Sequence, residues 1–200
     1  LYTENLRSAR QTDYYTLRGD PGGEVYESHF TFHGFRYVEI SGYPGDPSRD
    51  TLTALVLHSV NLEALEFECS DVLVNQLQRN IRWGWLGNSL DVPTDCPQRD
   101  ERLGWTGDAQ VFVKTATYQT DSAGFFTKWI QDLSDAQWVT GAIPSVAPVI
   151  PSLKTFDGGA AWSDAFIIVP WTIWQQYGDQ RILETHYAAM CRYMDYLVDN

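Results

Sequence analysis

The densest group of polar side chains lies between positions 91 and 108, in the stretch DVPTDCPQRDERLGWTGD. It contains the carboxylates Asp91, Asp95, Asp100, Glu101 and Asp108, together with Arg99 and Arg102. Trp105 stands among them. An indole face stacks on the C–H face of a sugar, while carboxylates bind the sugar hydroxyls. This combination therefore indicates a carbohydrate-binding loop.

Two other interpretations of the same stretch stay open at this point. The acids can be solvated charges paired with Arg99 and Arg102, with Asp108 serving only as a helix cap. A calcium loop is less well supported, because the stretch lacks the alternating oxygen ligands and the glycine spacing of an EF-hand.

A second candidate segment is DGGAAWSD at positions 157–164. Its glycines allow a close approach of the backbone, and Trp162 and Asp164 stand at the start of a predicted helix. The simpler interpretation is an N-cap beside a core tryptophan. The four histidines are isolated from one another, and Cys96 has no obvious base, so the sequence predicts no nucleophilic pair and no metal site.

Composition excludes several classes of protein. With 14 Lys plus Arg against 26 Asp plus Glu, the net charge is −12, which disfavours a nucleic-acid partner. No apolar stretch reaches the roughly 20 residues of a membrane span. The three cysteines form no CxxC pair and predict reduced thiols. The absence of an N-x-Ser/Thr sequon slightly favours a cytoplasmic over a secreted protein.

The elements that carry these residues change in character along the chain. Short alternating segments between Gly/Pro turns predict strands at 12–18, 25–32, 35–40 and 51–60. We therefore expect residues 1–66 to form part of an antiparallel β-sandwich.

From residue 67 onward, the spacing of apolar residues predicts helices only. The first begins at Asp71, with Leu73, Leu77, Ile81 and Trp85 on one face. The next are Asp108–Thr117, capped by Asp108, and a helix capped by Asp121. A loop at 155–159 precedes helices at 161–176 and 182–198. Their expected faces are Phe125, Phe126, Trp129, Ile130 and Leu133 on the third helix, and Tyr187, Cys191, Met194 and Leu197 on the last.

The run DVPTDCPQRDERLGWTGDAQ at 91–110 resembles that of bacterial α-L-rhamnosidases, family 78 of the glycoside hydrolases. The segments LYTENLRSARQTD at 1–13, FTFHGFRY at 30–37 and GGAAWSDA at 158–165 are similar to the same family. The resemblance implies a β-sandwich domain (1–66) followed by the first half of an (α/α)6 barrel (67–200), with both domains truncated.

The resemblance also implies a reaction, the release of terminal non-reducing α-L-rhamnose with inversion. The general acid falls on Glu101, whose pKa must be raised, for example by neighbouring carboxylates. Asp95, Arg99 and Asp108 match positions that hold rhamnose hydroxyls. Trp105 and Trp162 match aromatic walls, and Asp164 joins this substrate-binding set.

The matching general base lies in a later barrel loop, beyond Asn200. We therefore expect the chain alone to be inactive and, with apolar helix faces left open, poorly soluble. The implied partners are rhamnose-containing glycosides or polysaccharides, and acid–base hydrolysis requires no cofactor. A non-catalytic sugar-binding piece, a related barrel glycosidase for another sugar, and a structural helical domain are the alternatives.

Overall fold

The structure is a computed structural model that describes residues 1–61, 64–153 and 157–200. The chain divides into two compact units. The first unit comprises Leu1–Leu55 together with Cys96–Arg102, and the second comprises Val56–Asp95 together with Leu103–Asn200. The proposed acid and the predicted aromatic walls therefore fall in different units.

The first unit contains extended and turning backbone in place of the predicted strands. All of residues 1–61 are described, and they hold only the short 3-10 helices η1 (Glu4–Leu6) and η2 (Arg49–Thr51). The strands expected at 12–18, 25–32, 35–40 and 51–60 are therefore wrong. An extended segment becomes a strand only when a neighbour pairs with its N–H and C=O groups, and these described segments form no ladder.

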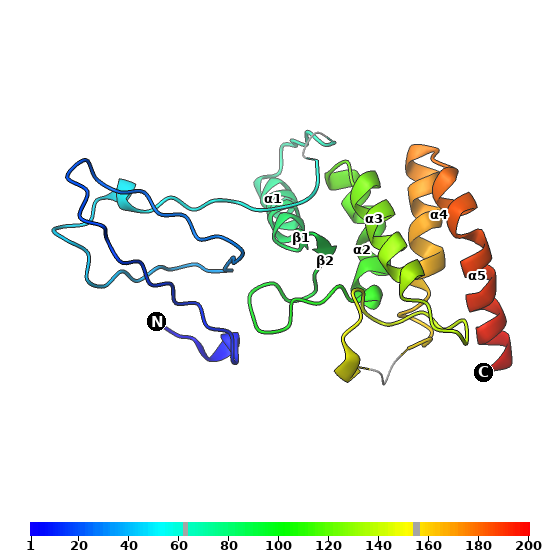
Figure 1. Cartoon of the computed structure of the whole chain (residues 1–200). Coiled ribbons are helices and arrows are strands. Elements are labelled where there is room, and N and C mark those ends of the chain that lie inside the picture. The colour runs from blue at the N-terminus through cyan, green and yellow to red at the C-terminus, as the bar shows by residue number, and fades with distance from the viewer. Residues whose placement is uncertain (62–63, 154–156) are drawn as a thin grey trace. The chain divides into compact units, whose positions relative to one another are not determined.

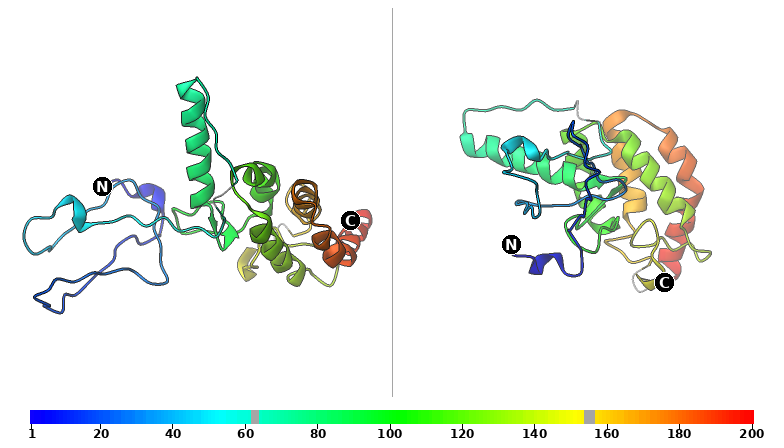
Figure 2. Two further views of the ribbon diagram at one scale, coloured as in Figure 1. Left: turned by 90° about the horizontal axis from the view of Figure 1, so that it is seen from above. Right: turned by 60° about the vertical axis from the view of Figure 1, so that its left-hand side comes forward.

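The second unit is mostly helical, as predicted from residue 67 onward, although it also contains a short β-hairpin that was not predicted (Figure 1). Its elements are α1 (Val72–Gly87), β1 (Ser89–Leu90), β2 (Val92–Pro93), α2 (Thr106–Gln119), α3 (Ala123–Asp135), η3 (Pro151–Leu153), α4 (Ala165–Tyr177) and α5 (Arg181–Asp199). The two short strands form an antiparallel hairpin around Asp91. Helix α4 packs against α2, α3 and α5, as the two views of Figure 2 also show.

The core of this unit is built around α3, whose predicted face is confirmed. Phe125, Phe126, Trp129, Ile130 and Leu133 are all buried. The ring of Phe126 also stacks on Trp85 of α1, with centroids 5.9 Å apart. Burial of such side chains contributes about 1.5–3 kcal/mol each to folding. Trp83 of α1 is, by contrast, 59% exposed.

The faces predicted for α1 and α5 are only partly buried. Leu73 and Leu77 of α1 are 76% and 57% exposed, although Asp71 caps this helix as expected. On α5, Tyr187 is 68% exposed, and Cys191 and Met194 are also exposed. The buried face of α5 consists of Ile182, His186, Ala189, Met190 and Tyr193. The predicted α5 face is therefore wrong at Tyr187, Cys191 and Met194, because the buried face lies one residue earlier along the helix, whereas Leu197 does pack against the core.

Three helix starts also differ from the predictions. Helix α2 begins at Thr106, so that Asp108 lies inside its first turn and does not cap it. Ser122, not Asp121, occupies the N-cap position of α3. Helix α4 begins at Ala165, four residues later than predicted, because residues 160–164 form turns. In the predicted loop at 155–159, positions 155 and 156 lie outside the described residues.

Among the described residues, none of the helices has both the length and the apolar character of a membrane span. Cys69 and Cys191 are free thiols.

Candidate functional site

The site in the second unit forms where the segments before α2 and α4 meet. The chain at 104–106 pairs with the chain at 145–147, where Ala147 N–H donates to Gly104 O over 3.1 Å. Both the backbone N–H and the hydroxyl of Thr106 donate to Ser145 O, each over 2.9 Å. These bonds fix the half-buried Trp105 at the N-cap position of α2.

Trp162 lies against the first turn of α2. A Cβ atom placed on Gly107 would sit 2.9 Å from the Trp162 Nε1 atom and 3.0 Å from its Cδ1 atom. The indole is nevertheless 44% exposed. The interpretation of Trp162 as a core residue is therefore wrong, and the ring offers an open face next to α2.

Asp164 holds the turn that carries Trp162. Its Oδ2 atom accepts from Ala161 N–H over 2.7 Å, and its Oδ1 atom accepts from the Tyr193 hydroxyl over 3.0 Å. Burial and this hydrogen bond raise the pKa of Tyr193 well above its ordinary value. Asp164 stands at the N-cap position of α4 but makes no capping hydrogen bond with its side chain. The simple capping interpretation therefore fails.

Asp157 is a structural anchor that the sequence reasoning did not assign. It accepts from the Trp138 indole over 2.7 Å and from Ser145 N–H over 3.3 Å. Its neighbour Gly158 donates to Ile143 O over 2.7 Å. These contacts tie the DGG stretch to the segment that pairs with the start of α2. The only signal in the sequence was the place of Asp157 in the glycine-rich segment.

Asp95 and Asp108 complete the predicted residues of this unit. Asp95 N–H donates to Leu103 O over 3.1 Å, and the residue is partly buried. Asp108 is exposed in the first turn of α2, where the positive end of the helix dipole favours a carboxylate. The second unit thus brings together Trp105, Trp162, Asp108 and Asp164 at the starts of α2 and α4.

The first unit holds the proposed acid. Glu101 Oε2 lies 2.8 Å from Arg99 Nη2 and 3.3 Å from Arg7 Nη1. The Glu101 side chain retains 20% of its exposure. Both guanidinium groups therefore form ion pairs with the Glu101 carboxylate. Arg7 is a site neighbour that the sequence did not single out, since it lies 94 positions before Glu101.

The other charged residues of this loop have separate partners. Asp100 accepts hydrogen bonds from the hydroxyl and the backbone N–H of Ser8, and the hydroxyl contact is the main reason that the pKa of Asp100 is lowered. Arg102 lies over the Phe32 ring, 4.1 Å from its centroid, and donates to Phe32 O over 2.7 Å. Arg102 thus contacts Phe32 with its guanidinium group.

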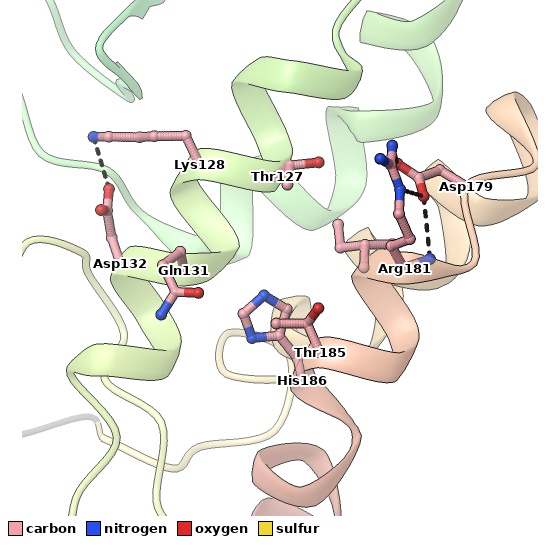
Figure 3. A pocket seen from close by; sticks show the side chains of 9 residues that line it. Thr127, Lys128, Gln131, Asp132, Asp179, Arg181, Thr185 and His186 are labelled. Atoms are coloured by element: carbon pink, nitrogen blue, oxygen red, sulfur yellow. Dashed lines mark hydrogen bonds and ion pairs between the residues drawn. The ribbon is translucent and has the colours of Figure 1, made fainter.

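A separate hollow of about 540 Å³ lies between α3 and α5 (Figure 3). Its charged side chains neutralise one another, with Lys128 2.8 Å from Asp132 and Arg181 2.8 Å from Asp179. His186 lines it and is 3% exposed, and burial lowers the pKa of its imidazole. None of the predicted sugar-contacting residues lines this hollow.

Comparison with known families identifies the chain. Residues 63–200 match the family described as the bacterial alpha-L-rhamnosidase 6 hairpin glycosidase domain. The chain belongs to the bacterial α-L-rhamnosidases. Residues 1–58 match the concanavalin-like domain of the same proteins, which is the part that lacks strands here.

Individual rhamnosidases are similar along nearly the whole chain. An α-L-rhamnosidase of Streptomyces avermitilis is 50% identical over 197 residues, which make up 98% of this chain and 19% of that protein. One from Formosa agariphila is 44% identical, covering 97% of this chain and 21% of its own length. The chain thus spans about a fifth of the length of these relatives.

A solved structure shares the fold. The crystal structure of the Streptomyces avermitilis α-L-rhamnosidase complexed with L-rhamnose superposes with a TM-score of 0.94 and 50% identity. The match covers 100% of this chain and 19% of that one.

Proposed function

We propose that the protein containing this chain hydrolyses terminal α-L-rhamnosides with inversion of the anomeric configuration. The observation that carries the proposal is the 50% identity to a rhamnosidase along 98% of the chain. That relative has been solved with L-rhamnose bound. Because the chain spans about a fifth of its relatives, the activity is assigned to the whole protein. The proposed domains are 1–66 and 67–200.

Glu101 is the proposed general acid. It would donate a proton to the leaving glycosidic oxygen, while a base from outside these 200 residues activates water on the opposite face of the sugar. Inverting enzymes hold these two carboxyl groups about 6.5–9.5 Å apart. A general acid must carry its proton to donate it, so we expect kcat/KM to fall as the pH rises and this proton is lost.

The remaining predicted residues would bind the sugar. Trp105 and Trp162 offer apolar ring faces, which suit a sugar whose C6 is a methyl group. The proposed ligands for the sugar hydroxyls are Asp95, Arg99, Asp108 and Asp164.

The test is hydrolysis of aryl α-L-rhamnosides by the full-length protein. We expect Glu101→Gln to lower kcat/KM by about 10²–10⁴-fold on a substrate with a poor leaving group, and by less on a good one. Glu184→Gln, at an exposed position of α5, is the matched control. NMR of the first turnovers should show the anomer opposite to that of the substrate.

The outcomes separate the parts of the proposal. An active protein whose Glu101→Gln variant matches the control would remove Glu101 from the chemistry. Retention of configuration would overturn the inverting mechanism. A folded protein that cleaves other aryl glycosides in a panel, but not the rhamnoside, would overturn the substrate.

A further inference from the structure

Gly107 occupies a position in α2 at which most helices have a residue with a side chain. It is the second residue of α2, a position at which alanine favours the helix more than glycine does. A Cβ atom at Gly107 would approach three ring atoms of Trp162 to between 2.9 and 3.1 Å. The indole therefore packs directly on the backbone of the first turn of α2.

The backbone around Trp162 is held independently of this contact. Ala161 has a φ of 70°, in the left-handed region that residues with a side chain seldom adopt. Its N–H donates to Asp164 and its carbonyl oxygen accepts from the Gln110 amide of α2. The fully buried Tyr193 holds Asp164 from α5. Hydrogen bonds from α2 and α5 thus hold this turn in place. The position from which the Trp162 side chain projects is therefore fixed.

We propose that Gly107 is a positioning residue for substrate binding, which seats the Trp162 indole on the first turn of α2. The same turn carries the exposed Asp108. The contact with Gly107 thereby places an aromatic face on the same helical turn as a carboxylate. One pyranose ring can then stack on the indole and donate a hydroxyl hydrogen bond to the carboxylate. This inference rests on the proposed function, because it assumes that Trp162 contacts the sugar.

The experiment uses the full-length protein in four forms: wild type, Gly107→Ala, Trp162→Ala and the double variant. Gly84→Ala is the control, since Gly84 lies inside α1 with nothing within 4 Å of a new Cβ. The readouts are the Kd for L-rhamnose, KM and kcat for an aryl α-L-rhamnoside, and Tm.

We expect Gly107→Ala to raise both Kd and KM by about 3- to 10-fold, the range of an aromatic contact, with kcat little changed. Its Tm should not fall, because alanine favours the helix and the part-exposed indole can turn toward solvent. In the Trp162→Ala background, the same substitution should change Kd by less than about 2-fold, since no ring is left to displace.

Other results overturn the inference in distinguishable ways. If wild type binds and cleaves the rhamnoside but Gly107→Ala matches Gly84→Ala, the seating role is wrong and the proposed function stands. If Gly107→Ala raises Kd equally with and without Trp162, Gly107 acts by another route and the inference fails. If wild type neither binds L-rhamnose nor cleaves rhamnosides, the proposed function fails and this inference fails with it.

Discussion

Gly104 offers the sharpest test of how the loop before α2 is held. It is buried, and a Cβ atom there would press into the carbonyl oxygen of Ala147. The same atom would lie 3.1 Å from Trp129 Nε1 and 3.3 Å from Val92 Cβ. These neighbours are backbone or fully packed core, so Gly104→Ala must displace the chain at 145–147.

The cost follows from the contacts that the displacement breaks. Ala147 O accepts from Trp129 Nε1–H over 3.3 Å, and Ala147 N–H donates to Gly104 O over 3.1 Å. Each such bond contributes about 0.5–1.5 kcal/mol, and overpacking a core costs about 1–3 kcal/mol. We therefore expect a loss of about 2–6 kcal/mol in the free energy of unfolding. The gain of about 0.4–1 kcal/mol from a stiffer unfolded chain does not offset it.

The assay is thermal unfolding of the full-length protein, followed by circular dichroism, beside rhamnoside kinetics. Gly104→Ala should lower the Tm of the helical domain by 5 °C or more, on the order expected for this loss. It should also raise KM, because Trp105 follows directly in the chain. Gly84→Ala, with open space around it, should leave stability unchanged or raise it by up to about 1 kcal/mol. Equal Tm values for wild type and both variants would refute the argument.

Three further predictions follow from individual contacts. Arg7→Gln removes a half-exposed cation 3.3 Å from Glu101, and kcat/KM should fall by less than in Glu101→Gln, because Arg99 still lies 2.8 Å from the carboxylate; a loss as large as that of Glu101→Gln would contradict this. Burial lowers the pKa of His186 below its ordinary value of 6.5. The contribution of His186 to the free energy of unfolding should therefore be complete above pH 6.5 and decrease as the pH falls below it. Urea unfolding of His186→Gln should show a shallower decrease. Trp85→Phe loses the 2.7 Å bond to Thr120 Oγ1 and should cost about 1–3 kcal/mol in the same assay; an unchanged urea midpoint would argue against it.

Helices were predictable from the sequence to the extent that their pattern is local. The period of apolar residues identified α3 and its buried face, because five large side chains coincide on one side. On α1 the same reasoning correctly found an apolar face, yet Leu73 and Leu77 are exposed. Periodicity shows that a face is apolar and says nothing about which element covers it. Strands failed for a related reason, since alternation at 12–18 does not supply a partner.

The contacts that support the candidate site could not be predicted from the sequence. The sugar-binding role of Trp105 was predicted from the chemistry of indoles and carboxylates and those of Asp108 and Trp162 from the family resemblance, and these roles stay predictions. Tyr193, Asp157 and Arg7 were missed because each acts on a residue far away in the chain: Tyr193 contacts Asp164 across 29 positions. A hydrogen bond between distant segments leaves no spacing pattern to detect.

The glycines of the run did carry a detectable signal. Glycine is unfavourable inside a helix, so Gly107 in the first turn of α2 indicates a close approach by another group. Gly104 and Gly107 meet two different segments, the chain at 147 and the ring of Trp162. The four residues 104–107 thus contact two segments that are distant in the chain. Mutating Glu101 tests the proposed chemistry, whereas adding one methyl group at Gly107 tests the geometry of the binding site. The two variants should therefore differ in their kinetics, the first losing mainly kcat and the second raising mainly KM.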